Sequence, residues 1–499
     1  MNPGKIVSFV ITPLVVAGLV LFADFEPGKP LVTYTFCVAL LMAVWWITEA
    51  VPLAVTSLLP VALFPLFGIM DGKTVSGAYF NDVIFLFMGG FLVALAMERW
   101  GLHRRIALYI LNFTGVSPAR ILLGFMLASF FLSMWISNTA TVMMMLPIAM
   151  SVINQLDGLM KPGKSSGFSV GLLLGIAYSA STGGMATLVG TPPNLSFSRI
   201  FHIYFPLAPE ISFAAWMMFA LPVSVLMAAF IWIFLFYRFR PSKAEWTEID
   251  KNTFTNQLKA LGKSSREERI IFVVFILLAF LWIFRSDLDL GEFSIPGWAG
   301  LFPESKFIND GSIAIFMAVL LFLIPSKKGG TLLDWPTASK LPWNILLLFG
   351  GGFALATGFK ESGLSLWFGE GLSGIAGLHP LYIIFSVALL MTFLTELTSN
   401  TATTEMILPI LAGIAISSGI HPLLLMIPAT LSASMAFMLP VATPPNAIIF
   451  GTSRISVRQM ATTGLIINLF GAVIVTVMMY YWGDVVFGTS EIPHWMNIK

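Results

Sequence analysis

The chain has 499 residues, of which 57% are hydrophobic and only 10% are charged. Soluble domains carry about 25% charged residues, so this composition excludes an ordinary soluble protein and is typical of a chain that crosses a bilayer many times. The 27 Lys and Arg nearly balance the 25 Asp and Glu, so nothing suggests nucleic acid as a partner. Cys37 is the single cysteine, which excludes disulfides within the chain and thiolate metal clusters.

Apolar runs near the roughly 20 residues that cross a bilayer recur along the chain, whereas a β-barrel would show short alternating strands. We therefore expect an all-α polytopic membrane protein. Spanning helices are predicted at 6–23, 31–50, 52–69, 81–99, 169–203 (broken), 213–237, 270–286, 311–325, 343–360, 422–451 (broken) and 461–484. No convincing small-residue cleavage site closes the first run, so residues 1–30 are predicted to hold a retained N-terminal helix.

Residues 238–269 form the one long polar interruption, with eight Lys or Arg and five Asp or Glu. A connector rich in Lys and Arg is expected on the cytoplasmic side, where it separates a first repeat, 31–237, from a second, 270–499. Stretches 118–155 and 380–418 are each either a pair of spans or a re-entrant hairpin, and both alternatives return the chain to the side it left. The prediction is about eleven transmembrane helices plus two re-entrant helical hairpins, with the amino terminus cytoplasmic and the carboxy terminus extracytoplasmic.

Two nearly identical segments carry the clearest signal of duplication. "SNTATVMMMLPI" begins at Ser137 and "SNTATTEMILPI" at Ser399, 262 residues later, and nine of the twelve positions agree. "GGFLVALAMERWGL" at Gly89 and "GGFALATGFKESGL" at Gly351 have the same offset. Because five predicted crossings separate equivalent segments, they enter the membrane from opposite sides, which is the inverted-topology repeat common in secondary transporters.

Each SNT triplet is predicted to start a helix, since Ser, Asn and Thr accept the unpaired N–H groups of a first turn. Inside a membrane such a positive helix end must face a cavity, an ion or a ligand, and two of them brought together suit the two ends of a small anion. The alternative is that the triplets only cap buried helices and bond to neighbouring ones.

A second matched pair follows, "GTPPN" at Gly190 and "ATPPN" at Ala442. Tandem prolines break a helix and free carbonyls in the preceding turn, and these suit a hard cation such as sodium; a plain kink is the alternative. Each repeat also supplies hydroxyl groups near these carbonyls. Ser133 lies four residues before Ser137, and Thr395 lies four residues before Ser399, so each pair is expected to share a helix face. The two symmetric sites contain neither His nor a shared carboxylate, which favours sodium over proton coupling.

Several residues with suggestive chemistry are given a structural interpretation instead. Glu49, Glu98, Glu396 and Glu405 have no counterparts in the other repeat, so structural pairing or a position near the interface is favoured over a direct role.

"GLMKPGKS" at 158–165 matches a phosphate-loop pattern but lacks the preceding strand and the following soluble helix, so nucleotide binding is not expected. The lack of a His or Cys cluster argues against an enzyme, and a channel would need a continuous polar pore.

With both triplets, both Pro-Pro-Asn breaks and "AVWWITEAVPLAVTSLLP" at 43–60, nearly the whole chain resembles the divalent anion:sodium symporter family, the sodium-coupled dicarboxylate carriers. The resemblance implies two or more sodium ions. One sodium site is implied at Ser133, Ser137, Asn138 and the Gly190 carbonyl, and another at Thr395, Thr398, Ser399, Asn400 and the Ala442 carbonyl. The implied substrate ligands are Asn138, Thr139, Thr191, Pro192, Asn400, Thr401, Thr443 and Pro444.

The expected function is therefore sodium-coupled uptake of a C4 dicarboxylate such as succinate, fumarate or malate by a plasma membrane protein, in a bacterium the inner membrane. The resemblance further implies a homodimer, surrounded by lipid, in which transport domains move against a scaffold in an elevator-like manner. A sodium-independent dicarboxylate exchanger, or a carrier of citrate or sulfate, is the alternative.

Overall fold

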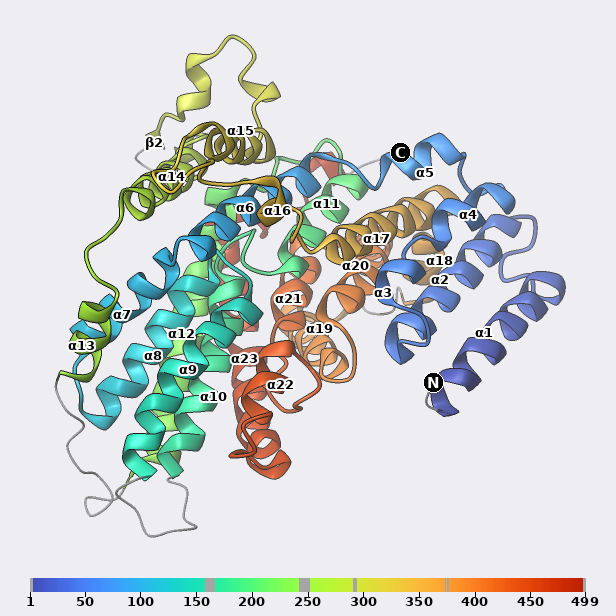
Figure 1. Ribbon diagram of the computed structural model, residues 1–499. Coiled ribbons are helices and arrows are strands. Elements are labelled where there is room, and N and C mark those ends of the chain that lie inside the picture. Colours follow the sequence, from blue (N-terminus) through green and yellow to red (C-terminus); the bar gives the residue numbers. More distant parts are fainter. Residues whose placement is uncertain are drawn as a thin grey trace.

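The computed structural model describes residues 3–157, 167–241, 252–289, 294–372, 374 and 377–496, and almost all of its regular structure is helical (Figure 1). The predicted phosphate-loop decoy at 158–165 and part of the connector lie outside the described residues. The helices of the first half are α1 Pro3–Phe22, α2 Pro30–Thr48, α3 Leu53–Thr56, α4 Leu59–Leu66, α5 Gly72–Gly77, α6 Asp82–Arg99, α7 Leu102–Thr114, α8 Pro118–Ser133, α9 Asn138–Asp157, α10 Gly167–Met185, α11 Pro192–Tyr204 and α12 Phe213–Phe239.

The connector contributes α13 Thr253–Ala260 and leads into the second half. That half contains α14 Arg266–Ile283, α15 Asp310–Leu323, α16 Trp335–Ala338, α17 Trp343–Ser362, α18 Leu364–Gly371, α19 Pro380–Thr395, α20 Asn400–Ser418, α21 Leu423–Ala433, α22 Pro444–Phe450 and α23 Val457–Phe487. A two-residue antiparallel pair, β1 Leu288–Asp289 with β2 Ser294–Ile295, and three short 3-10 turns, Trp298–Leu301, Ser305–Phe307 and His494–Met496, complete the described elements.

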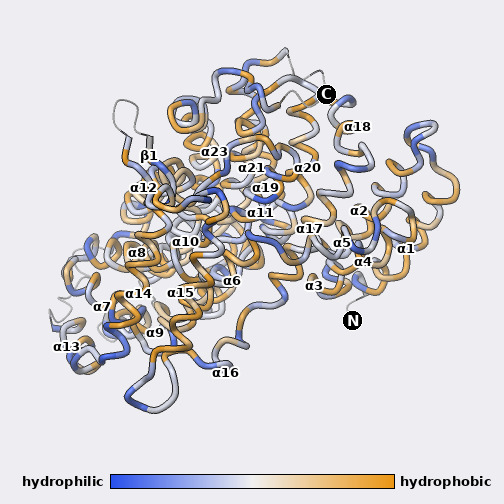
Figure 2. The backbone as a smooth tube through the Cα atoms, turned by 90° about the horizontal axis from the view of Figure 1, so that it is seen from above, coloured by the Kyte–Doolittle hydropathy of each residue, from blue (hydrophilic) through white to orange (hydrophobic). Residues whose placement is uncertain are grey.

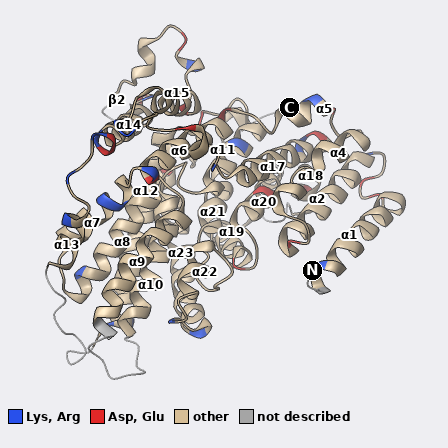
Figure 3. Cartoon of the chain, in the orientation of Figure 1, with Lys and Arg blue, Asp and Glu red and all other residues tan. Residues whose placement is uncertain are grey.

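The protein is an integral membrane protein. Seven helical segments of the described residues have the length and composition to cross a bilayer, and five shorter apolar ones accompany them. Apolar side chains face outward on several helices, such as Leu14 on α1 at 67% exposure and Val273 on α14 at 62%, and their exposure to water would be unfavourable. Figure 2 shows α1 as mainly hydrophobic along its length, and Figure 3 shows few charged residues within the helices. Lipid therefore replaces water around much of the molecule.

Most predicted helices agree with the structure to within a few residues, but the single helix predicted at 52–69 is wrong. The chain there forms α3 and α4, separated at Ser57 and Leu58, and Pro60 in the first turn of α4 lacks the N–H that would continue the α3 ladder. A hydrogen bond stabilises this break between α3 and α4, since the Trp46 Nε1–H donates to Ser57 Oγ at 3.2 Å. Helices α7 and α18, which were not predicted, follow α6 and α17 after a tight turn at Gly101 and at Gly363, both with positive φ.

The elements repeat in the same order in the two halves, and the hairpin helices keep the 262-residue spacing of the sequence repeat. Helices α8 and α19 each have 16 residues and begin 262 positions apart, and α9 and α20 begin at Asn138 and Asn400. Each hairpin is followed by a helix that stops before a Pro-Pro pair and by a second helix that starts on it. The long helices α12 and α23 then close the two series.

The two halves interlock at the places where their helices are interrupted. Helix α11, which follows the first Pro-Pro break, packs against α20, the helix that starts at the second SNT triplet. Helix α22, which follows the second break, packs against α9 and α10 of the first half. Each break therefore lies beside the SNT helix of the other half, and this exchange brings four interrupted segments into one region.

A buried ion pair fastens α7 to the start of α14. Arg105 Nε donates to Glu268 Oε2 at 3.0 Å, its Nη2 donates to Oε1 at 3.2 Å, and its Nη1 donates to the Gly262 carbonyl at 3.0 Å. Arg105 is 6% exposed and Glu268 is 8% exposed. The connector and α7 are thus held together by a charge pair shielded from water.

Replacing Arg105 by Met should destabilise the fold, because the Glu268 carboxylate would stay buried without its partner, a loss of about 3–5 kcal/mol. The measurement is the midpoint of thermal unfolding of the purified protein in detergent. Arg104→Met is the matched control, since the neighbouring Arg104 is exposed. Equal midpoints for the two variants would contradict a stabilising role for the pair.

Candidate functional site

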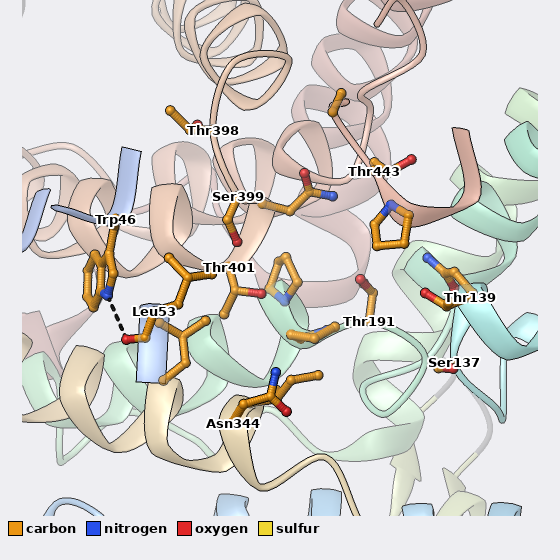
Figure 4. A pocket seen from close by; sticks show the side chains of 18 of the residues that line it. Trp46, Leu53, Ser137, Thr139, Thr191, Asn344, Thr398, Ser399, Thr401 and Thr443 are labelled. Carbon is orange, nitrogen blue, oxygen red and sulfur yellow. Dashed lines mark hydrogen bonds between the residues drawn. The ribbon is translucent and has the colours of Figure 1, made fainter. Parts of the chain in front are cut away.

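One cavity of about 780 Å³ lies where the four interrupted segments meet (Figure 4). All eight residues that the resemblance implied as substrate ligands line it: Asn138, Thr139, Thr191, Pro192, Asn400, Thr401, Thr443 and Pro444. Figure 4 shows Thr191, Ser399 and Thr401 around its middle, with Thr139 and Ser137 on one side and Trp46 and Leu53 on the other. The structure therefore brings together residues that lie more than 300 positions apart in the chain.

The first SNT triplet forms the turn between α8 and α9. Ser137 precedes α9, and its Oγ accepts the N–H of Ala140 at 3.1 Å, so the predicted capping is confirmed for this copy. Behind the turn, the Ser133 hydroxyl is hydrogen bonded to Asn138 Oδ1. Ser133 is fully buried and does not line the cavity, whereas Ser137 and Asn138 do.

The second triplet has the same turn but a different capping pattern. The predicted helix start is confirmed, because Ser399 precedes α20 with extended backbone, but its side chain accepts no hydrogen bond from the first turn. The neighbouring Thr398 hydroxyl contacts the Thr403 hydroxyl and donates to the Leu394 carbonyl at 2.8 Å. The Ser399 hydroxyl thus lines the cavity without serving the helix start.

Thr395 lies behind the second turn at the position of Ser133. Its Oγ1 is 2.6 Å from Asn400 Oδ1 and 2.8 Å from the Ala433 carbonyl oxygen. A hydroxyl carries one proton and cannot donate fully to two acceptors at once. Among these three oxygen atoms only the Thr395 hydroxyl carries a proton, so one of the two short contacts lacks a full hydrogen bond.

Each Pro-Pro break is held open by the Asn that ends its motif. Asn194 Nδ2 donates to the carbonyls of Met185 at 3.3 Å and Thr187 at 2.7 Å. Asn446 Nδ2 donates in the same way to Ala436 at 2.9 Å and Leu439 at 3.1 Å. Both Asn residues are fully buried. The sequence analysis missed this role, although the matching Asn in both motifs was a signal for it.

The expectation that the breaks release several carbonyls for ligands is corrected in part, because the Asn side chains use some of them. Gly190 and Ala442, whose carbonyls the resemblance implied as sodium ligands, both line the cavity. Gly184, which the sequence analysis also missed, allows the first break to approach the first tip. A Cβ added there would lie 2.6 Å from Asn138 Oδ1 and 3.0 Å from the Gly190 carbonyl oxygen.

Charge is nearly absent from the cavity. Among the described residues that line it, only Lys5 and Glu49 are charged, and the SNT and Pro-Pro-Asn residues are all neutral. Nor does the described part of the chain gather three or more His, Cys, Asp or Glu as a transition-metal site would. The cavity offers helix starts, hydroxyls, amides and carbonyls, which suit an anion together with alkali cations.

The other three carboxylates of the sequence analysis lie outside the cavity lining. The Glu396 carboxylate accepts the backbone N–H of Met438 at 2.8 Å and Asn468 Nδ2–H at 2.7 Å, so it joins α19 to the second break and to α23. Glu405 on α20 is fully buried and accepts the Ser196 hydroxyl at 2.6 Å. Glu98 also lies away from the cavity.

An all-α membrane protein whose two matched halves place helix starts and broken helices around one neutral cavity has the architecture of a secondary transporter. The chain belongs to the divalent anion:sodium symporter family, because the model described as "Sodium:sulfate symporter transmembrane region" matches residues 5–489. It is a transport protein and not an enzyme.

Two named relatives cover almost the whole chain. The sodium-dependent dicarboxylate transporter SdcS of Staphylococcus saprophyticus is 43% identical over 502 residues, which cover 99% of this chain and 94% of the relative. The protein of the same name from Staphylococcus aureus is 42% identical over 494 residues, with 98% and 93% covered. The family resemblance drawn from the two motif pairs is thereby confirmed.

Two solved structures share the fold at low identity. The YdaH transporter of Alcanivorax borkumensis superposes with a TM-score of 0.55 at 14% identity, over 85% of this chain and 90% of that one. MtrF of Neisseria gonorrhoeae gives 0.54 at 12% identity, over 94% and 97%. At these identities the similarity concerns the fold alone.

Proposed function

We propose that the protein is a symporter that couples sodium entry to the uptake of a C4 dicarboxylate such as succinate, fumarate or malate. The observation that carries the proposal is the convergence of both SNT turns and both Pro-Pro-Asn breaks on one cavity. The names of the two SdcS relatives, sodium-dependent dicarboxylate transporters, support the same substrate class.

In the proposed binding mode, one carboxylate of the substrate meets Asn138 and Thr139 at the start of α9, and the other meets Asn400 and Thr401 at the start of α20. Helix starts present unpaired N–H groups and a positive dipole end, so each stabilises negative charge without a cationic side chain. Four further residues, two from each break, line the cavity beside them: Thr191, Pro192, Thr443 and Pro444.

Sodium is proposed to bind behind each turn, as a co-transported substrate. The first site would use Ser133, Ser137, Asn138 and the Gly190 carbonyl, and the second Thr395, Thr398, Ser399, Asn400 and the Ala442 carbonyl. The buried hydroxyl oxygen of Thr395, placed between two acceptor oxygens, supports a cation there. Each Asn then links a sodium ion to a substrate carboxylate, which makes the binding of cation and anion interdependent.

The membrane arrangement is part of the proposal. We place the amino terminus in the cytoplasm and the carboxy terminus outside, with eleven crossings, and we take α8–α9 and α19–α20 as re-entrant hairpins of two inverted repeats. A homodimer in which transport domains move in an elevator-like manner is carried over from the family resemblance. Cross-linking of single-cysteine variants of the otherwise cysteine-free C37S protein would test this dimer.

Succinate uptake into proteoliposomes should require an inward sodium gradient. A dianion that enters a compartment held 100 mV negative faces about 4.6 kcal/mol, since each charge is worth about 2.3 kcal/mol. Two sodium ions cancel this cost, and a third makes the potential drive uptake. Equal uptake with potassium in place of sodium would overturn the symporter and favour a sodium-independent exchanger.

Sulfate is the rival substrate that the family description itself suggests. Two helix starts in separate walls match two separated carboxylates better than one compact tetrahedral anion. Unlabelled fumarate and malate are therefore expected to compete with labelled succinate at lower concentrations than sulfate or citrate. Strong competition by sulfate alone would reassign the substrate while leaving the sodium sites in place.

A further inference from the structure

Lys5 and Glu49 form the one charged feature of an otherwise neutral cavity within the described residues. Lys5 lies in the first turns of α1, and Glu49 follows the last residue of α2. Their side chains are 41% and 64% exposed, and Lys5 Nζ is 3.5 Å from Glu49 Oε2. These exposures place the pair where the cavity opens, away from the buried residues behind the SNT turns.

The backbone at Glu49 is held in a conformation that favours glycine. Its φ of 47° and ψ of 37° are left-handed, and within the described residues Ser453 is the other non-glycine residue with positive φ. A long acidic side chain at such a position is uncommon, and strained positions of this kind cluster at ligand-binding sites. The turn directs the Glu49 carboxylate toward α1. A glycine at this position would end α2 without strain but would supply no carboxylate.

Lys5 is held opposite by contacts between α1 and α2. Trp45 Nε1 donates to the Ser8 carbonyl at 3.4 Å, and the Trp45 ring stacks on Phe9 with centroids 5.9 Å apart. These contacts lie about one turn beyond Lys5 on α1. The ammonium group is therefore kept at the opening, while its four-carbon stem leaves the charge free to change partner.

We propose that Lys5 is a recognition residue for the dicarboxylate at the mouth of the cavity, with Glu49 as its partner when no substrate is present. This inference rests on the proposed function. A loose, exposed ion pair contributes little to stability, so a substrate carboxylate can replace Glu49 at small cost. When Lys5 is not beside it, Glu49 repels a dianion. The dianion is therefore attracted to the cavity mouth only along a path that brings its carboxylate to Lys5.

Removing the charge of Lys5 and removing that of Glu49 should change the half-saturating succinate concentration in opposite directions, on one face of the membrane. Lys5→Ala should raise the half-saturating succinate concentration roughly threefold to tenfold on the face where the cavity opens, because an unpaired Glu49 would then face the dianion. Glu49→Gln should lower that concentration, and the double variant should return near the original value. Lys5→Arg keeps the charge and should behave as the unaltered protein.

Labelled succinate transport in right-side-out and inside-out membrane vesicles measures the two faces separately. The Lys5→Ala effect should appear on one face only and should shrink between about 20 mM and 500 mM salt, where exposed charges are screened. Lys73→Ala is the control, since Lys73 is exposed on α5 and does not line the cavity. No effect of Lys5→Ala, or an equal effect on both faces, would overturn the inference.

The proposed function fails by a different result, namely no sodium-driven succinate uptake by the unaltered protein. If that protein carries labelled sulfate instead, the same variants and the same two vesicle types decide the role of Lys5 with sulfate. An unchanged sulfate affinity in Lys5→Ala then rejects the recognition role, and a one-sided rise in half-saturation supports it.

Discussion

Asn138→Ala and Asn400→Ala should each lower the initial rate of sodium-driven succinate uptake by about tenfold or more. Each Asn lines the cavity, and its Oδ1 contacts a buried hydroxyl, Ser133 in one half and Thr395 in the other. Loss of a hydrogen bond to a charged group costs about 1.5–3 kcal/mol, and 1.4 kcal/mol is a factor of ten. Because the two turns correspond, the two losses should be similar in size.

The measurement is initial uptake as a function of both succinate and sodium concentration. Each variant should raise the half-saturating concentration of sodium as well as that of succinate, because the amide is proposed to serve both. Asn154→Ala is the control, as Asn154 is exposed near the far end of α9. Unchanged transport by either cavity variant would make that turn architectural and limit the binding site to the other half.

Gly352→Ala should destabilise the protein strongly, by about 2 kcal/mol or more, through its contact with Glu405. A Cβ added at Gly352 on α17 would overlap the Glu405 carboxyl group, which is fully buried against it on α20. Overpacking of a buried site typically costs about 1–3 kcal/mol, and here it would also disturb the hydrogen bond from Ser196 at 2.6 Å.

Glu405→Ala removes the obstructing group, so the double variant should be more stable than the sum of the two single losses predicts. Thermal unfolding midpoints of all four proteins form the cycle that measures this coupling. Gly18→Ala is the control within an apolar helix, because a Cβ added at Gly18 meets nothing within 4 Å. Additive losses would show that the two residues act independently.

The sequence located segments that line the cavity better than it predicted the local geometry around them. The repeated SNT triplets and Pro-Pro-Asn motifs are visible in one dimension, and the eight residues implied by the family resemblance that they carry all line the cavity. The Ser399 side chain, the approach of the first break at Gly184 and the carbonyl bonds of Asn194 depend on what packs nearby. The Asn138 that faces Gly184 lies 46 residues away, and the acceptors of Asn194 come into reach only because the chain turns back at the break.

The short helices were missed for a related reason. Helix α7, "LHRRIALYILNFT", is amphipathic and too polar for a span, and α18 has only eight residues. Hydropathy over a window long enough to detect a span therefore overlooks both. The predicted helix at 52–69 failed because its apolar composition hid a break that Trp46 and Ser57 stabilise in three dimensions.

The exchange of α11 and α22 between the halves bears on the ancestry of the chain. Since each Pro-Pro break packs beside the SNT helix of the opposite half, a half-length protein would possess every motif yet could not assemble one complete wall of the cavity. If the two halves arose by duplication of a half-length chain, two copies of that chain would have had to associate to enclose the cavity. In one continuous chain the two halves need not be identical, and they differ here: Glu405 faces Gly352, whereas the first half has Met143 at the corresponding position.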